Sequence, residues 1–173
     1  MKEMKNVRPD FEEWEGTASE IDASYQKVTC HMIFDVKMLD SDGIFRRKAQ
    51  YVAGGHTTEN PAALTYVSVV SRYLVRIALT LAALNGLDIL ACDIQYAYIT
   101  AQCREKIWTV AGPEFGSDIG KIFIIKMALY GLKSSGAVFF SLLAETLQEL
   151  NYVPSKADPD VYMRPAVKPN GFE

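Results

Sequence analysis

The chain has 173 residues, of which 49% are hydrophobic and 23% charged, and its formal net charge at pH 7 is −3. This composition is typical of a soluble globular protein and excludes a disordered or fibrous chain. The weakly acidic balance argues against a domain whose whole surface binds nucleic acid, because such domains are usually basic.

The first 26 residues are predicted to form an acidic, loosely ordered segment. They are polar and aperiodic, and residues 1–25 hold seven acidic side chains against three basic ones. A stretch of this kind buries little apolar surface. The acidic surplus therefore belongs to this segment, and the remainder, residues 27–173, is close to neutral and leaves room for a local basic groove.

The cysteines and the apolar stretches indicate an intracellular protein. Cys30, Cys92 and Cys103 are odd in number and show no CxxC spacing, so neither a disulfide framework nor a zinc site is expected. The first residues are charged, which predicts no signal peptide. The most apolar stretch, residues 74–92, is interrupted by polar residues such as Arg76, which predicts no transmembrane segment. We expect a cytoplasmic or nuclear location and no membrane partner.

Residues 30–55 are predicted to form a β-hairpin. Residues 30–38 alternate as a strand does, residues 40–43 read Asp-Ser-Asp-Gly, and residues 44–53 return as the second strand. The returning strand carries three cations in a row, Arg46, Arg47 and Lys48. Taken alone, such a run is usually the solvated edge of a sheet.

A helix and a buried strand are predicted next. Ser71 can cap a helix whose apolar residues, up to Leu84, fall at helical spacing, and Gly86 can end it. Residues 87–94 are predicted to form a central strand with Asp93 near its C-terminal end.

The remaining elements complete an α+β fold with a mainly antiparallel sheet and packed helices. Residues 107–110 and 122–125 are predicted to be a strand pair, and Ser134 or Ser135 to cap another helix. Residues 161–167 are expected to be an exposed sheet edge without a partner strand, and such an edge invites self-association.

Six segments stand in a characteristic order: RKAQYVAGG (47–55), VVS (69–71), LAAL (81–84), CDIQYAY (92–98), ALYGLK (128–133) and ADPDVY (157–162). Together they resemble the reverse transcriptase domain of Ty1/copia-type retrotransposon polyproteins. The resemblance implies the fingers and partial palm of a right-hand polymerase, with a fingers hairpin over residues 30–55 and palm and fingers over residues 56–173. It also implies RNA-templated DNA synthesis from deoxynucleoside triphosphates, with Mg²⁺ as cofactor. The implied partners are an RNA or DNA primer–template and the remainder of the polyprotein.

The resemblance assigns metal binding and catalysis to Asp93, which matches the family's first catalytic aspartate. The carbonyl oxygen of Ile94 matches a second metal ligand. Two metal ions held by carboxylates can activate a 3′-hydroxyl and stabilise the leaving pyrophosphate. The alternative interpretation of Asp93 is a turn-capping residue.

Nucleotide binding is assigned by the resemblance to five residues. Tyr98 matches the aromatic residue beneath the incoming sugar, Arg47 and Lys48 match basic residues of the fingers, and Gly131 and Lys133 match the stretch beneath the nascent base pair. Cations bind phosphate, and glycine permits close approach of a backbone. The alternatives are a core aromatic residue for Tyr98 and a turn glycine for Gly131.

The chain departs from the family pattern in its carboxylates. The family's second catalytic motif, Y/F-x-D-D, is missing, because no two consecutive aspartates occur in the sequence. Asp158 and Asp160 flank Pro159 and match a turn of the family instead. Gln50 stands where the family usually has an arginine. We therefore expect a truncated domain that is inactive by itself. The alternatives are a non-catalytic nucleic-acid-binding remnant of the same fold and an unrelated α+β enzyme with a carboxylate-centred site.

Overall fold

The computed structural model describes residues 2–38, 45–59 and 67–165. The chain forms two compact units. The first unit comprises residues 1–66 and 96–139, and the second comprises residues 67–95 and 140–173. Mixed helices and sheets confirm the predicted α+β class, and among the described residues the sheets are antiparallel except for one strand pair. The expected boundaries of fingers and palm remain a prediction.

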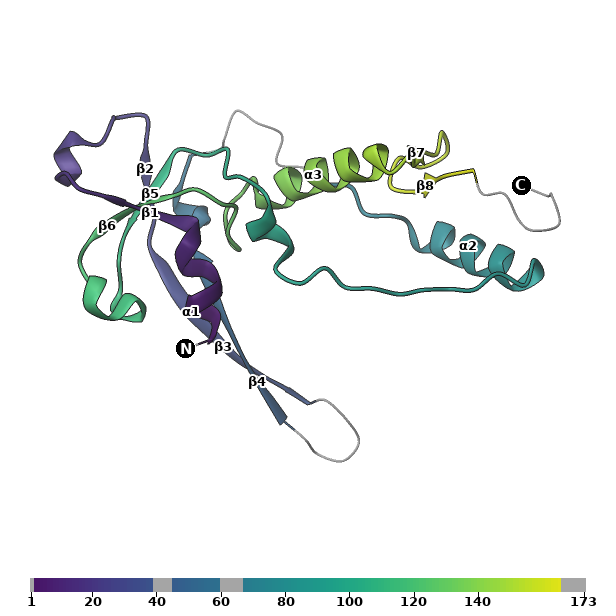
Figure 1. Cartoon of the computed structure of the whole chain (residues 1–173), viewed down its shortest axis with the longest axis horizontal. Coiled ribbons are helices and arrows are strands. Elements are labelled where there is room, and N and C mark those ends of the chain that lie inside the picture. Colours follow the sequence, from purple (N-terminus) through teal and green to yellow (C-terminus); the bar gives the residue numbers. More distant parts are fainter. Residues whose placement is uncertain (1, 39–44, 60–66, 166–173) are drawn as a thin grey trace. The chain divides into compact units, whose positions relative to one another are not determined.

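A four-stranded sheet forms the centre of the first unit (Figure 1). Its strand order is β1 (Phe11–Trp14), β6 (Ile122–Ile125), β5 (Ile107–Val110) and β2 (Gln26–Lys27). β6 pairs antiparallel with both β1 and β5, while β2 runs parallel to β5. The predicted pairing of residues 107–110 with 122–125 is confirmed.

The N-terminal segment differs from the loosely ordered tail that the sequence predicts. Residues 2–14 form helix α1 (Lys2–Val7), the 3₁₀ helix η1 (Arg8–Asp10) and strand β1. Met4, Val7 and Phe11 are buried in the core of the first unit. In the sequence these three apolar residues stand among polar ones and form no recognisable pattern. Their burial stabilises the segment because each removes apolar surface from water.

The predicted hairpin is confirmed as strands β3 (Cys30–Met38) and β4 (Phe45–Ala53). They pair antiparallel from Cys30 opposite Ala53 to Met38 opposite Phe45. The predicted turn at residues 40–43 lies outside the described residues. Helix α1 lies beside this hairpin (Figure 1), and the backbone amide of Tyr51 donates a hydrogen bond of 3.4 Å to the Glu3 carboxylate.

Aromatic rings fill the core between these elements. Phe11 makes edge-to-face contacts with Phe115 and Tyr51, with ring centroids 5.4 and 6.0 Å apart. Phe115 stacks on Phe123 at 5.1 Å. Because these rings come from β1, β4, β6 and the 3₁₀ helix η5 (Pro113–Asp118), they join the hairpin to the sheet.

Three further 3₁₀ helices are η2 (Ala18–Glu20), η3 (Gly55–Thr57) and η4 (Ala97–Thr100).

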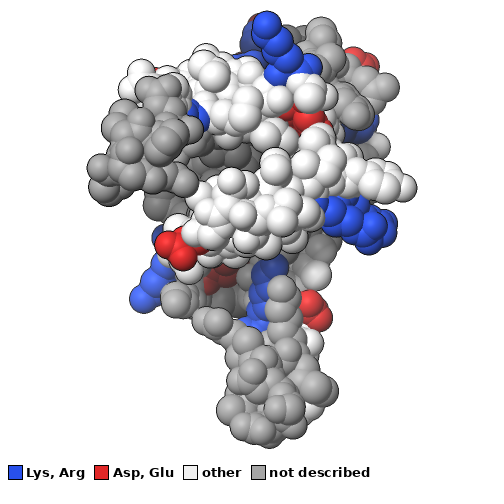
Figure 2. Space-filling view, turned by 90° about the vertical axis from the view of Figure 1, so that its right-hand side faces the viewer, with Lys and Arg blue, Asp and Glu red and all other residues white. Residues whose placement is uncertain are grey.

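Basic and acidic side chains both occur on the molecular face drawn in Figure 2, among uncharged ones.

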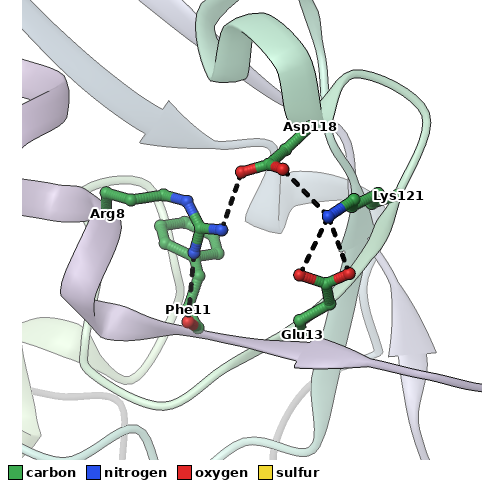
Figure 3. A network of polar contacts seen from close by, with 5 residues as sticks. All are labelled: Arg8, Phe11, Glu13, Asp118 and Lys121. Atoms are coloured by element: carbon green, nitrogen blue, oxygen red, sulfur yellow. Dashed lines mark hydrogen bonds and ion pairs between the residues drawn. The ribbon is translucent and has the colours of Figure 1, made fainter.

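A defined ionic network ties the N-terminal segment to the β5–β6 connection (Figure 3). Asp118 accepts ion pairs from Arg8 at 3.0 Å and from Lys121 at 2.9 Å, and Lys121 also reaches Glu13 at 2.9 Å. The Arg8 guanidinium lies 4.3 Å from the centroid of the Phe123 ring. The network holds β1 to its neighbours from outside the core.

The second unit contains helix α2 (Arg72–Leu84) and the strand pair β7 (Val153–Pro154) and β8 (Tyr162–Met163), while α3 (Ser135–Glu149) begins in the first unit and continues into the second. The predicted cap is confirmed, because the Ser71 hydroxyl accepts a 3.2 Å hydrogen bond from the Leu74 amide. Gly86 follows with φ of 58°, as expected at a helix C-terminus.

The expected sheet edge at residues 161–167 is described only in part. β8 pairs antiparallel with β7, so Tyr162 and Met163 have a partner strand on one side. Residues 166 and 167 lie outside the described residues, and self-association stays a prediction. Among the helices that the structure describes, none has the length and apolar composition needed to cross a membrane.

The prediction of a buried strand over residues 87–94 is wrong. These residues form no strand, and they are exposed, with Leu90 at 91% of its maximal area. An apolar run indicates a preference for burial, but a strand forms only where a neighbouring strand satisfies its backbone amides and carbonyls. No described residue supplies that neighbour.

Candidate functional site

Two of the characteristic sequence segments meet backbone to backbone in the first unit. The Ala53 amide, at the end of β4, donates a 2.8 Å hydrogen bond to the Tyr130 carbonyl, and Val52 forms a parallel bridge with Tyr130. We call residues 52–55 with residues 130–132 the glycine junction. It joins the end of the hairpin to the segment ALYGLK.

Glycines make this close approach feasible on both sides. Gly131 has φ of 91°, and a Cβ atom on it would overlap the Ala53 carbonyl oxygen. A Cβ atom on Gly55 would overlap the Gly131 carbonyl oxygen and lie 2.9 Å from the Leu132 Cα. Gly131 thus allows a close approach between two stretches of the chain's own backbone, while its predicted position beneath a nascent base pair stays a prediction.

Lys133 is anchored to the loop that follows the hairpin. Its ammonium group donates a 2.5 Å hydrogen bond to the Thr58 carbonyl. The Thr58 hydroxyl in turn donates at 2.8 Å to the Gly55 carbonyl. Because the loop is tied back to Gly55, the positive charge of Lys133 has a defined place beside the glycine junction.

Tyr98 reaches the same junction from η4. Its ring lies 4.7 Å from the ring of Tyr130 and 6.1 Å from that of Phe139, measured between centroids. The residue before η4, Tyr96, has left-handed backbone angles (φ of 56°), an uncommon conformation for a bulky residue. Its hydroxyl accepts a 2.6 Å hydrogen bond from Asn6. The entry to η4, and with it the Tyr98 ring, is held in place from α1.

Arg47 and Lys48 are exposed on β4, farther out along the hairpin. They pair with Val36 and Asp35 of β3, so as successive residues they point to opposite faces of the hairpin. Arg47 is six residues from Ala53, roughly 20 Å along an extended strand. These two cations therefore lie away from the glycine junction.

The structure does not bring a metal site together. Asp93 and Ile94 belong to the second unit, in an exposed segment without regular structure. Asp158 and Asp160 form a turn, in which the Asp160 amide donates at 2.9 Å to the Asp158 carboxylate. Within the described ranges, no three or more His, Cys, Asp or Glu residues cluster so that they could hold a metal ion. Among the described residues, the carboxylates near Asp93 are therefore too few to make up, by themselves, the two-metal site that the resemblance implies.

Burial keeps two of the thiols unreactive. It raises the pKa of Cys30 to about 11 and that of Cys103 to about 11. The thiolate, rather than the thiol, is the nucleophile and the metal ligand. Both side chains are therefore protonated at neutral pH.

Sequence reasoning missed Glu105, which lies between η4 and β5. Its carboxylate accepts a 2.9 Å hydrogen bond from the backbone amide of Ser134 and a second one from the Ser134 hydroxyl. Ser134 follows Lys133 directly. The serine was predicted as a helix cap, but no pattern in the sequence indicates a partner 29 residues away.

The model of the family described as reverse transcriptase (RNA-dependent DNA polymerase) matches residues 20–170 of this chain. The chain belongs to the reverse transcriptase family. The resemblance drawn from the six segments is confirmed, since the match covers all of them.

Two proteins that the chain is similar to are polyproteins of yeast transposons. Over 124 residues, or 65% of the chain, the sequence is 32% identical to the transposon Ty1-NL2 Gag-Pol polyprotein of Saccharomyces cerevisiae. Over 122 residues, or 64% of the chain, it is 32% identical to the Ty1-BL Gag-Pol polyprotein of the same organism. The chain is therefore a reverse transcriptase domain of Ty1/copia type, and the aligned part spans 7% of the length of these relatives. No solved structure matches it.

Proposed function

We propose that the chain contributes the fingers and part of the palm of a right-hand polymerase and binds the incoming deoxynucleoside triphosphate beside the glycine junction. One observation carries this proposal: Tyr98, Gly131 and Lys133 gather around the end of β4. They are the three residues of the first unit, outside the hairpin, that the resemblance assigns to nucleotide binding. Their meeting is not a consequence of sequence proximity, because Tyr98 precedes Lys133 by 35 positions.

The chemistry of the junction suits a nucleotide. Tyr98 is half-buried and rests on Tyr130, so its ring has a fixed orientation in which it can lie under a sugar. A ring in van der Waals contact with C2′ leaves no room for a 2′-hydroxyl, which favours deoxynucleotides. The Lys133 ammonium adds a positive charge, which attracts a triphosphate.

The exposed hairpin cations belong to the same proposal. Arg47 and Lys48 lie on opposite faces of β4, roughly 20 Å from the junction at the Arg47 end. We propose that they contact the phosphate backbone of the template, with Arg47 offering two parallel donors and Lys48 a point charge. A primer–template of RNA or DNA and the remainder of the polyprotein are the corresponding partners.

Catalysis requires more than this chain supplies. We propose that Asp93 contributes one carboxylate to a divalent-metal site, with Mg²⁺ as the ion, and that other acidic residues of the polyprotein complete it. Two adjacent dications repel each other strongly unless several carboxylates lie between them. The chain by itself is then a nucleotide-binding part of a polymerase.

Nucleotide titration tests the proposal. The purified chain is titrated with dUTP and with UTP, which differ only in the 2′-hydroxyl, each with Mg²⁺, and binding is followed by calorimetry. We expect dUTP to bind at least about tenfold more tightly than UTP, about 1.4 kcal/mol in binding free energy. Tyr98→Ala should remove this preference, while Tyr152→Ala, an aromatic deletion in the second unit, should keep it. Equal affinities for dUTP and UTP that Tyr98→Ala leaves unchanged would contradict the proposal.

A further inference from the structure

Glu105 closes the N-terminal end of helix α3. The first hydrogen bond of the helix runs from the Val138 amide to the Ser134 carbonyl at 2.9 Å, which makes Ser134 the N-cap residue. In a capping box, a glutamate three residues into the helix accepts from the N-cap amide. Here that position is Ala137, which has no acceptor in its side chain, and Glu105 accepts from the Ser134 amide instead.

The hydrogen bond between the Ser134 amide and the Glu105 carboxylate fixes the end of the segment that carries Gly131 and Lys133. The segment is held at Tyr130, next to Gly131, by the hydrogen bond from the Ala53 amide and at Lys133 by the Thr58 carbonyl. Ser134, which is only 1% exposed, is the third attachment, and Glu105 supplies it. The Ser135 hydroxyl adds a 2.6 Å bond to the Leu129 carbonyl inside the same turn.

Loss of the Glu105 carboxylate should displace Ser134 strongly. Removing the Glu105 carboxylate leaves two donors of Ser134, the amide and the hydroxyl, without their acceptor in a buried place. A buried donor without a partner costs more than the hydrogen bond contributed, because its hydration is lost and not replaced. A carboxylate near a helix N-terminus also interacts favourably with the helix dipole. The segment can avoid this cost only by moving Ser134 toward water, and Lys133 would move with it.

We infer that Glu105 is a positioning residue of the nucleotide site: through Ser134 it sets where Gly131 and Lys133 lie beside the glycine junction. This inference rests on the proposed nucleotide binding. It adds a residue that does not itself touch the nucleotide and that belongs to none of the six characteristic segments.

Three variants of the whole chain test the inference through their affinity for dTTP. Glu105→Ala removes the acceptor, and we expect it to weaken dTTP binding about tenfold. Glu105→Gln keeps an acceptor oxygen, and we expect affinity within about threefold of the original chain. Ser134→Ala removes one of the two donors, and its affinity for dTTP should lie between the affinities of Glu105→Ala and Glu105→Gln. Glu145→Ala, an exposed position on α3, serves as the matched control and should change nothing.

Hydrogen exchange supplies a readout that does not depend on nucleotide. The Ser134 amide should exchange faster in Glu105→Ala than in the original chain and stay protected in Glu105→Gln, while far-UV circular dichroism stays the same. If Glu105→Ala does not fold, Ser134→Ala and Glu105→Gln decide, and unchanged dTTP affinity in Ser134→Ala overturns the inference.

The outcomes separate the inference from the proposed function. If the original chain binds dTTP and Glu105→Ala binds it equally well, the inference fails and the proposed function stands. Unchanged exchange of the Ser134 amide in Glu105→Ala also overturns the inference. If the original chain binds no dTTP, the proposed function fails and the inference fails with it.

Discussion

Gly131 and Ala53 approach so closely that the place of a Gly131 side chain is already taken by the Ala53 carbonyl oxygen. The two residues are 78 positions apart and belong to two different characteristic segments. Their contact is therefore a tertiary requirement and not a local turn preference. The positive φ of Gly131 adds a second reason why this position favours glycine.

Replacing Gly131 by alanine should destabilise the chain severely. We expect Gly131→Ala to lower the free energy of unfolding by more than about 3 kcal/mol, because it combines an unfavourable backbone conformation with a steric clash. Gly120 is the matched control: it has φ of 84°, but a Cβ atom there would meet nothing within 4 Å. Gly120→Ala should therefore cost only about 1–2 kcal/mol, the backbone contribution alone. Urea denaturation of both variants measures the difference, and equal losses would contradict the account of the junction.

Asp10 should make the stability of the chain depend on pH. It is 9% exposed, one of its carboxylate oxygens is buried without a hydrogen-bond partner, and burial raises its pKa to about 6. The folded state therefore holds the proton more tightly than the unfolded chain. This contribution to stability is complete below the ordinary pKa near 3.8 and is lost as the pH rises through about 6.

The corresponding variant is Asp10→Asn, which keeps the shape and removes the charge. We expect it to raise the free energy of unfolding at pH 8 by about 1–3 kcal/mol and to leave the value at pH 4 nearly unchanged. Urea denaturation at the two pH values checks this, with Glu15→Gln, an exposed carboxylate just after β1, as control. A gain of equal size at both pH values would show that charge burial is not the cause.

Asp118 should have the opposite effect to Asp10 on the pH dependence of stability. Hydrogen bonds from Lys121 and Arg8 lower its pKa, so its contribution to stability is present above its ordinary pKa and is lost as the pH falls below that value. Asp118→Asn should lower the melting temperature at pH 7 and low salt. The difference should shrink in 1 M salt, which screens exposed charges, and at pH 3. An effect that is the same at both salt concentrations would contradict the role assigned to the ionic network.

The purified chain should not extend a primer. Asp93 stands in a sequence without two consecutive aspartates, and two metal ions need more negative charge between them than one carboxylate provides. The measurement is incorporation of labelled dNTP on a primed RNA template with Mg²⁺ or Mn²⁺. Template-dependent incorporation above that of Asp93→Asn would overturn this expectation.

Elements with a strong local signal were predictable from the sequence. The hairpin of β3 and β4, the pair of β5 and β6, and the helices after Ser71 and Ser134 all follow from periodicity and caps within a few residues. β1 was not predictable in this way, because its partner β6 begins more than 100 residues later. Residues 87–94 show the converse: an apolar run that lacks a partner strand among the described residues.

The candidate site was predictable only where a resemblance supplied the roles. Tyr98, Gly131 and Lys133 were named through their segments, and the structure brings them together. Glu105 carries no recognisable pattern, since its function depends on a partner that only the fold brings near. Asp93 was named as well, but its place in an exposed segment of the second unit gives no support to a complete metal site.

The most direct test of nucleotide binding at the glycine junction is photo-crosslinking with 8-azido-dATP, followed by tryptic digestion and mass spectrometry. The account predicts that the label falls on residues 127–133, the tryptic peptide that contains Tyr130, Gly131 and Lys133, and that excess unlabelled dTTP abolishes it. A label found only on peptides that contain neither Tyr98 nor a residue of the glycine junction, or one that dTTP does not displace, would contradict the central claim.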